Sequence, residues 1–240
     1  MQSQGVALFI HDLSHNFGTR TIIEHFDLEV KAGEFVSFLG PSGSGKSTLL
    51  RLIAGLVEAS TGGLKLSDSL AAKSFVFQDS NLLPWRNLRE NLELVFELTG
   101  EALRASRITE ALELVGLQDD SLKYPNQLSG GMRMRASVAR ALLTKPRLLL
   151  LDEPFSALDE NTRFRLQEEL YSIWQKQKMT VLFVTHSISE AVFLSQRAIV
   201  IGGTPARIVK DYKVVLPDQR DADLRTDAAF ISQIKLVSQV

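Results

Sequence analysis

Apolar residues along the chain follow two different spacings, and these spacings predict the elements of the fold. The apolar run at residues 7–10 and the alternating segment at 26–30 predict strands of an antiparallel layer. Longer apolar runs lie within residues 34–40, 147–154 and 179–186. Runs of this kind are typical of parallel strands that are covered on both faces, so the sequence predicts an α/β core.

Helical spacing replaces the strand pattern over residues 84–143. One helical face is shared by Leu88, Leu92, Val95 and Phe96. Gly100 is placed to end that helix, and further helices are predicted over residues 101–115 and 129–143. Helices therefore interrupt the strands, and we expect a single domain of residues 1–240 with an inserted helical subdomain at 84–143.

The C-terminal residues 228–240 predict one more helix, docked on the core. The apolar positions with the spacing of a docked face are Phe230, Ile231, Ile234 and Val237.

Composition and charge exclude some classes of protein. Of the 240 residues, 45% are hydrophobic and 23% are charged, as in an ordinary globular protein. The net charge of −1 gives no electrostatic reason to expect nucleic acid as a partner, and the lack of cysteine excludes disulfides and thiolate metal sites. The first 20 residues lack a basic leader, and no apolar stretch approaches the roughly 18 residues of a spanning helix. We expect a soluble protein that reaches a membrane only through a partner.

A glycine-rich loop, GPSGSGKST, follows the strand predicted at 34–40. It comprises Gly40, Pro41, Ser42, Gly43, Ser44, Gly45, Lys46, Ser47 and Thr48. The loop fits the phosphate-loop pattern in full, with a strand before it and a helix, ended by Gly55, after it. Its backbone N–H groups and the helix N-terminus would bind phosphate oxygens. Lys46 would add a positive charge, and Ser47 would offer a hydroxyl to Mg²⁺.

Two acidic residues end another predicted strand in LLLLDEP, residues 148–154. Asp152 is suited to orient Mg²⁺ through its water shell, and Glu153 to polarise an attacking water as general base. Alone, such a pair is also common at a surface turn. Together with the phosphate loop, it predicts hydrolysis of a nucleotide.

Three further residues are ambiguous by themselves. His186 follows a predicted strand and can hydrogen-bond a γ-phosphate or the attacking water, but a lone histidine is more often structural. Gln78, in FVFQDS, is of a type common in polar loops. Phe17 has a ring that can stack on adenine, although single aromatic residues more often belong to a core or a turn.

A second glycine-containing element, LSGGMRMR at residues 128–135, lies far along the chain from the phosphate loop. At a helix N-terminus it offers a hydroxyl, backbone N–H groups and a positive dipole end, which suit a γ-phosphate. From these eight residues alone, a helix N-cap followed by glycines is the simpler interpretation.

The whole set of motifs resembles the ATP-binding subunit of ABC transporters. Phe17, the phosphate loop, Gln78, LSGGM, LLLLDEP, SALD at 156–159 and His186 occur in the family's order and at similar spacing, over nearly the whole chain. The segments VFQDSNLLPWRNLRENL and YPNQLSGGMRMR most resemble the nitrate/sulfonate/taurine importer group. The resemblance implies an α/β P-loop NTPase (RecA-like) core with an N-terminal antiparallel β-subdomain and an inserted α-helical subdomain.

The resemblance also implies a role for each motif. Phe17 would stack on the adenine of ATP, and Gln78 would sense Mg²⁺ and the water while linking to the transmembrane permease. His186 would be the switch histidine, and Asp159 would cross a dimer interface. The signature motif would consist of Ser129, Gly130, Gly131 and Met132. It would complete the ATP site of a second copy in a head-to-tail dimer.

The implied function is that of an ATP-hydrolysing motor subunit for import of a small solute. Its partners would be permease subunits and, indirectly, an extracytoplasmic solute-binding protein, and it would lie peripherally on the cytoplasmic face of the cell membrane. We expect residues 79–86 to dock the permease, because Leu82, Leu83 and Trp85 form an apolar group after Gln78.

Other functions remain open at this point. They are an exporter or lipid-transport ATPase, a soluble ABC-type ATPase acting on ribosomes or DNA, and a non-catalytic nucleotide-binding scaffold. Two departures from the family pattern bear on partner fit: Met134 stands where glutamine is usual, and the segment 62–75 is short by several residues.

Overall fold

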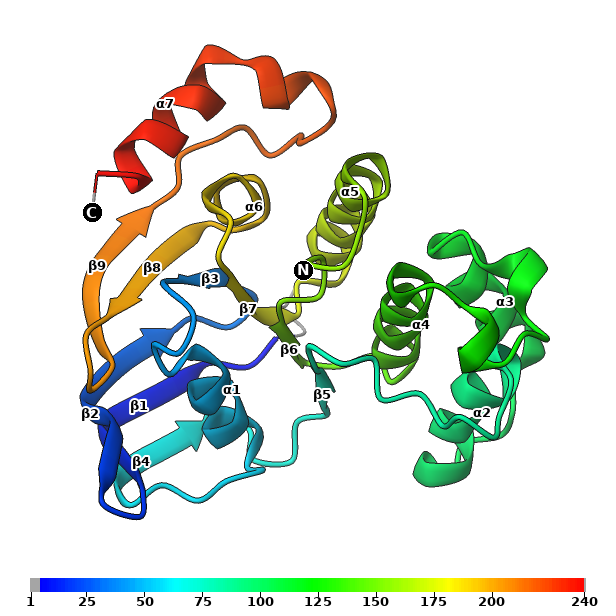
Figure 1. Ribbon diagram of the computed structural model, residues 1–240, viewed down its shortest axis with the longest axis horizontal. Coiled ribbons are helices and arrows are strands. Elements are labelled where there is room, and N and C mark those ends of the chain that lie inside the picture. Colours follow the sequence, from blue (N-terminus) through cyan, green and yellow to red (C-terminus); the bar gives the residue numbers. More distant parts are fainter. Residues whose placement is uncertain (1–4, 240) are drawn as a thin grey trace.

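The computed structural model describes residues 5–239, with a small β-sheet at one end, a larger sheet and its helices in the middle, and a group of helices at the other end (Figure 1). The smaller sheet has the order β2-β1-β4 and is antiparallel throughout. Its strands are β1 (Leu8–Phe17), β2 (Arg20–Val30) and β4 (Thr61–Leu66). The antiparallel layer predicted at residues 7–10 and 26–30 is confirmed. Both strands extend beyond these runs because they meet in a tight hairpin, with Phe17 paired to Arg20.

The larger sheet has the order β5-β6-β7-β3-β8-β9. Its strands are β3 (Phe35–Leu39), β5 (Lys73–Val76), β6 (Leu148–Asp152), β7 (Thr180–Thr185), β8 (Arg197–Gly202) and β9 (Arg207–Lys213). All neighbours are parallel except β8 and β9. The three strands predicted from continuous apolar runs are β3, β6 and β7, which are central and buried at every residue. This confirms the predicted parallel core.

Alternate residues of the central strands pack into two separate cores, because successive side chains of a strand point to opposite faces. Val36 and Leu150 pack with α1 (Lys46–Ala54) and the antiparallel sheet. Phe35 and Phe183 pack on the other side, with the helices that cover that face. Those helices include α5 (Glu160–Gln177), α6 (Ile188–Leu194) and α7 (Ala228–Val237).

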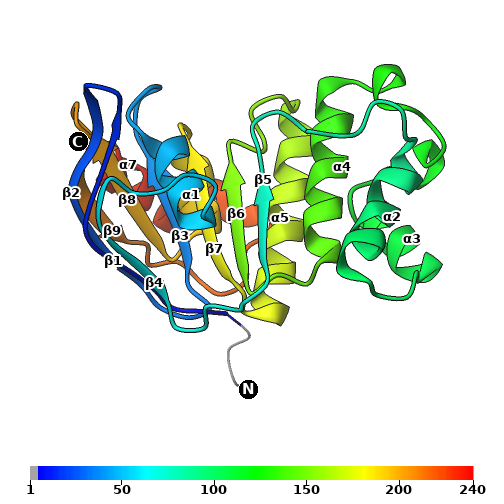
Figure 2. The same ribbon diagram turned by 90° about the horizontal axis from the view of Figure 1, so that it is seen from below.

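The chain between β5 and β6 forms a group of helices at one end of the molecule (Figures 1 and 2). Its elements are α2 (Leu88–Thr99), α3 (Ala105–Leu114), the 3₁₀ turns Gln118–Asp120 and Pro125–Gln127, and α4 (Gly130–Leu143). All four residues predicted to share one face of α2 are buried, and Gly100 ends that helix at a φ of 71°.

Helix α3 begins four residues later than predicted from the spacing at 101–115. Arg104 has an extended backbone, and Glu101 binds the Arg107 side chain across the start of the helix with an N–O distance of 2.9 Å. The side chains before Ala105 therefore form an exposed lead-in to the helix and do not extend it.

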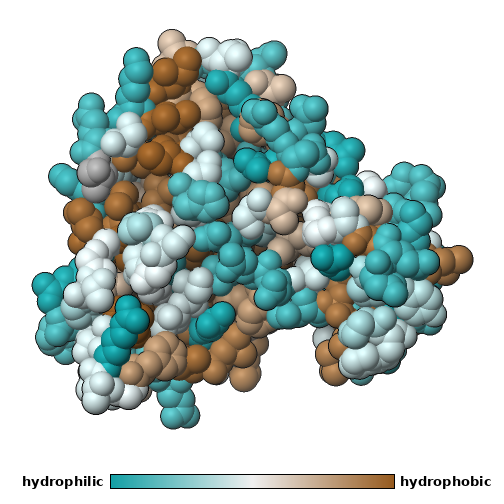
Figure 3. All heavy atoms as spheres, viewed as in Figure 1, coloured by the Kyte–Doolittle hydropathy of each residue, from teal (hydrophilic) through white to brown (hydrophobic). Residues whose placement is uncertain are grey.

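The predicted C-terminal helix is α7, but its docked face is narrower than expected. Phe230 and Val237 are buried and Ile234 is partly buried, whereas Ile231 is 44% exposed. Ile231 lies about 100° around the helix from Phe230, which takes its side chain off the docked face. Figure 3 shows apolar surface over this helix. Among the helices of residues 5–239, none is long and apolar enough to cross a bilayer.

Candidate functional site

The phosphate loop joins the end of β3 to the start of α1, as the sequence predicts. Gly40 has a φ of 154°, and a side chain there would collide with the carbonyl oxygen of Ile201 in β8. Gly45 lies beside Ala206 and Ile22, so the loop is seated between β8–β9 and the β1–β2 hairpin. The first N–H groups of α1 are thereby placed at the carboxyl edge of the parallel sheet.

Lys46 is folded onto its own loop and is only 4% exposed. Its Nζ donates to the carbonyl oxygens of Gly40 at 2.9 Å and Pro41 at 2.7 Å. Burial lowers the pKa of Lys46, while the nearby carboxylates of Glu153 and Asp152 raise it. The ammonium group is thus held at the loop by carbonyls, in a position where phosphate oxygens can replace them as acceptors.

Ser47 and Asp152 meet between α1 and β6. The Ser47 hydroxyl donates to Asp152 Oδ1 at 2.8 Å, and Asp152 is 1% exposed. Burial raises the pKa of Asp152, and the hydrogen bond from Ser47 opposes that shift. A hydroxyl and a carboxylate are oxygen ligands of the kind that Mg²⁺ prefers. Residues 5–239 contain no group of three or more His, Asp or Glu side chains that could hold a metal ion, so further ligands would have to come from the nucleotide or water.

Glu153 and His186 lie side by side at the ends of the neighbouring strands β6 and β7. His186 Nδ1 is 3.4 Å from Glu153 Oε2. Glu153 has a left-handed backbone with a φ of 50°, and its N–H donates to Val184 O at 3.0 Å. The side chain of His186 is 60% exposed, so the pair faces solvent on one side.

Phe17 and Gln78 both lie at strand ends. The Phe17 ring, at the end of β1, is 53% exposed and contacts the ring of His15 edge to face at a centroid distance of 4.7 Å. His15 is buried, and neither ring nitrogen has a hydrogen-bond partner among residues 5–239. Gln78 follows β5 by two residues and is exposed.

Ser129 caps α4, since its Oγ accepts a hydrogen bond from Met132 N at 3.2 Å. Asp159 caps α5 in the same way, with Oδ1 accepting from Thr162 N at 3.0 Å. A Cβ on Gly131 would lie 2.9 Å from Leu158 Cδ2, so the starts of α4 and α5 touch. Within one chain, the structure therefore brings LSGG together with SALD.

The same residues are not beside the phosphate loop of their own chain. Helices α4 and α1 lie on opposite sides of β5 and β6 in both views (Figures 1 and 2). Met132 is half-buried and packs on the core, while Ser129 and Gly130 are exposed.

The comparisons with known proteins identify the family. The family model described as "ABC transporter" matches residues 23–156. An aliphatic sulfonates import ATP-binding protein of Xanthomonas axonopodis pv. citri is 43% identical over 92% of this chain and 90% of the relative. The chain belongs to the ABC transporter family. It is an ATP-binding subunit of that family and an ATPase.

Other matches agree with this assignment. A nitrate import ATP-binding protein of Synechococcus elongatus is 40% identical over 88% of this chain and 84% of its own length. Among solved structures, the ATP-binding cassette MJ0796, in a dimeric post-hydrolysis state bound to ADP and Pi, matches with a TM-score of 0.78 at 30% identity. That match covers 88% of this chain and all of the other. The predicted α/β P-loop NTPase fold is confirmed.

Two residues of this ABC ATPase next to the Glu153–His186 pair escaped the sequence analysis. Glu190, in α6, is 7% exposed and accepts a hydrogen bond from Thr185 Oγ1 at 2.6 Å. Arg163, in α5, lies 3.7 Å from it through Nε. The only sequence signal for Glu190 is its place four residues, about one helical turn, after His186. That spacing alone does not predict the contact with Arg163.

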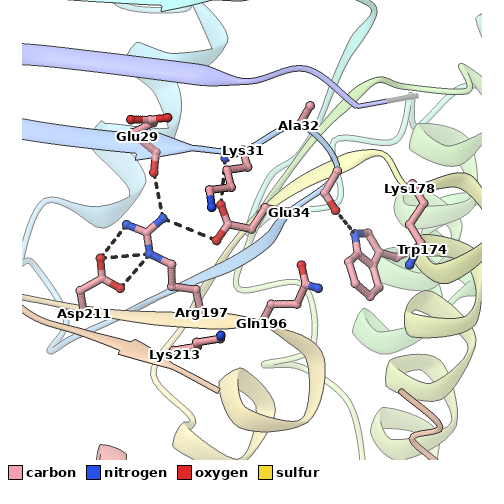
Figure 4. Close-up of a pocket in the computed structure, with 11 residues that line it drawn as sticks. Glu29, Lys31, Ala32, Glu34, Trp174, Lys178, Gln196, Arg197, Asp211 and Lys213 are labelled. Carbon is pink, nitrogen blue, oxygen red and sulfur yellow. Dashed lines mark hydrogen bonds and ion pairs between the residues drawn. The ribbon is translucent and has the colours of Figure 1, made fainter. Parts of the chain in front are cut away.

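A large cavity of this ABC ATPase, about 750 Å³, is remote from these residues (Figure 4). It opens at the amino ends of β3 and β8, the sheet edge opposite the phosphate loop. Three of its charged side chains pair: Arg197 donates to Asp211 Oδ1 at 2.8 Å and lies 3.5 Å from Glu34 Oε1. Trp174 Nε1 donates to the Gly33 carbonyl at 3.1 Å. The cavity size therefore does not mark the nucleotide site.

Proposed function

We propose that the chain drives import of a small solute of the sulfonate or nitrate kind through a separate permease, by hydrolysing ATP. The main support for ATP hydrolysis is that three groups of side chains converge at one edge of the larger sheet. Lys46, the Ser47–Asp152 pair and the Glu153–His186 pair come from the ends of β3, β6 and β7. The importer assignment is supported by the relatives, which are named for sulfonate and nitrate import.

In this proposal the phosphate loop binds the phosphates through its backbone N–H groups, and Lys46 transfers its hydrogen bonds from the loop carbonyls to phosphate oxygens. Ser47, Asp152 and Gln78 would hold Mg²⁺, which would neutralise negative charge on the bound phosphates. Glu153 accepts a proton from the attacking water, and His186 orients the water or the γ-phosphate. Phe17, exposed at the end of β1, stacks on adenine.

We further propose that ATP is sandwiched between two copies. Ser129, Gly130, Gly131 and Met132 lie away from Lys46 in the same chain, and the exposed Ser129 and Gly130 leave the α4 N-terminus open to a partner. A symmetric head-to-tail pair gives each phosphate loop the signature motif of the other chain. Asp159 lies beside that motif and would reach the same interface. The dimeric form of the similar cassette structure supports this arrangement.

The permease contact is proposed for residues 79–86 and the groove beside them. Trp85 is 71% exposed, whereas Leu82 packs partly against the helical core. A groove of about 230 Å³ runs between β5 and the helices α2 and α4, and half of its ten lining residues are apolar, including Phe75 and Leu98. We propose that residues 84–143 form a helical subdomain. The groove lies where this subdomain meets the larger sheet. An amphipathic helix of the permease fits a groove of this kind.

The subunit would sit peripherally on the cytoplasmic face of the membrane, held by the permease, with an extracytoplasmic solute-binding protein as an indirect partner. Export, lipid transport, and action on ribosomes or DNA have less support, because the relatives reported above that are named for a substrate carry out import.

The test is ATP hydrolysis by the purified chain with Mg²⁺. We expect turnover in the wild type and a loss of at least about 100-fold in Glu153→Gln, because a general base contributes about 10²–10⁴-fold. ATP binding should be retained, since the phosphate loop is unchanged. Glu160→Gln, an exposed acid at the start of α5, serves as the matched control for fold and charge. Wild-type turnover in Glu153→Gln would contradict the assigned mechanism.

A further inference from the structure

A small cavity of about 40 Å³ borders the Glu153–His186 pair, and both side chains line it. Its lining residues are Glu153, Ser156, Arg163, Thr185, His186, Ser187 and Glu190. Four of these seven side chains are ionisable, and they come from the end of β6, from α5 and from the β7–α6 junction. The cavity therefore joins the Glu153–His186 pair to side chains of α5 and α6.

Glu190 binds the residues on both sides of His186. Thr185, which precedes His186, donates from Oγ1 to Glu190 Oε2 at 2.6 Å. Ser187, which follows it, donates from N to Thr185 Oγ1 at 3.0 Å, and its own Oγ accepts from Glu190 N at 3.4 Å. Because the His186 ring is largely exposed, its position depends on these flanking bonds.

Arg163 connects the same carboxylate to the segment 156–159. Its Nε lies 3.7 Å from Glu190 Oε1, and its Nη2 donates to the carbonyl oxygen of Leu158 at 2.8 Å. At the other end of that segment, Ser156 Oγ donates to the Glu153 carbonyl at 3.0 Å. These contacts form a closed ring. It runs from His186 through Glu190, Arg163 and the segment 156–159 to Glu153, which contacts His186.

Burying Glu190 has a cost that its contacts only partly offset. Burial raises the pKa of this carboxyl group, while the Thr185 hydroxyl and the Arg163 guanidinium lower it. An apolar side chain would fill the first turn of α6 without that cost. A buried network of hydrogen bonds and charges holds its side chains in one arrangement, whereas apolar packing would allow several.

We propose that Glu190 and Arg163 are positioning residues that hold His186 against Glu153 and link this contact to the segment 156–159. The inference rests on the proposed function, in which Glu153 and His186 act on the attacking water. A change at the segment 156–159, which carries Asp159, then reaches the catalytic pair through Leu158, Arg163 and Glu190.

The first test uses two conservative substitutions. Glu190→Gln keeps the size and an acceptor for Thr185 but removes the charge that faces Arg163. Arg163→Lys keeps the charge but loses the fork that reaches Leu158. For each, kcat should fall about tenfold with KM for ATP changed less than about twofold, because a displaced catalytic group costs turnover and not binding. Arg165→Lys is the control, since its pair with Glu169, at 3.8 Å, lies outside this ring.

The second test separates positioning from general stability. If Glu190 acts through His186, Glu190→Gln should have no further effect on kcat in a His186→Ala background. An equal tenfold fall in both backgrounds would overturn the proposal, as would an undiminished kcat in Glu190→Gln. If Glu190→Gln fails to fold, Thr185→Val replaces it; this change removes both the donor to Glu190 and the acceptor for Ser187 N.

A third readout does not depend on turnover. The imidazole signals of His186, assigned in a spectrum of the four histidines by their loss in His186→Ala, should shift in Glu190→Gln and stay unchanged in Arg165→Lys. An unshifted ring would overturn the positioning role. A wild type that binds ATP but does not hydrolyse it would contradict the proposed function, while the His186 signals would still decide this inference.

Discussion

The Ser47 hydroxyl donates a hydrogen bond to Asp152 Oδ1 at 2.8 Å, joining the first turn of α1 to the last residue of β6. The contact brings a phosphate-loop residue to a strand more than 100 positions later in the chain. Asp152 is buried there, so its ionised form is costly to the folded protein unless a cation compensates it. Removing this charge should therefore change the free energy of unfolding.

Asp152→Asn should stabilise the nucleotide-free protein near neutral pH. Burial raises the pKa of Asp152 above its ordinary value of 3.8, so the folded protein holds this proton more tightly than the unfolded chain. Ionisation of Asp152 therefore lowers the free energy of unfolding as pH rises above 3.8. The advantage of the variant should grow as pH rises from about 4 through the raised pKa of Asp152 and stay constant above it, measured by denaturant unfolding.

Ligand addition should reverse that order. With Mg²⁺ and ATP, the wild type should gain more stability than Asp152→Asn, because a charged carboxylate binds the cation more strongly than a neutral amide does. Equal gains in the two proteins would remove Asp152 from the proposed metal site.

Trp85→Ala should weaken binding to the permease while sparing the fold. Because Trp85 is 71% exposed, its truncation should change the free energy of unfolding by no more than about 0.5 kcal/mol. ATP binding should be unchanged. Leu70→Ala removes another exposed apolar side chain, in the β4–β5 connection, and is the matched control. Co-purification with the permease measures the effect, and equal recovery of both variants would argue against docking at Trp85.

Mixing two inactive variants should restore one ATP site. Lys46→Ala damages the phosphate loop and Ser129→Arg damages the signature motif, so each variant alone forms two damaged sites in a dimer. A mixed dimer places both lesions in one site and leaves the other intact. Nucleotide trapping should therefore appear in the mixture and in neither variant alone. Trapping by Ser129→Arg alone at the wild-type level would contradict the shared site.

The two signature glycines should respond differently to alanine. A methyl group on Gly130 would meet only the end of the Arg133 side chain, at 3.9 Å, whereas one on Gly131 would press against Leu158 and the Ala157 carbonyl. Gly130→Ala should gain up to about 1 kcal/mol of helix stability. Gly131→Ala should gain less or lose stability, because Leu158 and the Ala157 carbonyl must give way. Thermal unfolding compares the pair, and a more stable Gly131→Ala would show that the contact between α4 and α5 is loose.

The central strands could be predicted because each is buried on both faces and is therefore apolar at nearly every position. Helix α5 could not, since it buries only a narrow stripe that includes Leu166, Leu170 and Trp174 among many polar residues. Strand β9 is an edge strand with mostly exposed side chains, so it has no apolar run.

In the candidate site, too, the sequence predicts only residues that belong to a local pattern. Lys46, Asp152, Glu153 and His186 could be proposed from the sequence because their motifs lie at or after the ends of predicted strands. Glu190 and Arg163 belong to different helices, and the chain carries no local pattern that pairs them. Contacts of this kind depend on how α5 packs against α6, which the sequence alone does not indicate.

In the proposed mechanism, the left-handed backbone at Glu153 sets stability against turnover at this position. A non-glycine residue held at a φ of 50° stores about 1–3 kcal/mol that glycine would release. A library selected only for heat resistance should therefore enrich glycine at this position and return well-folded chains that no longer hydrolyse ATP. Selection in a cell that depends on transport would keep the strained glutamate, and the stability lost there would have to be recovered elsewhere in the fold.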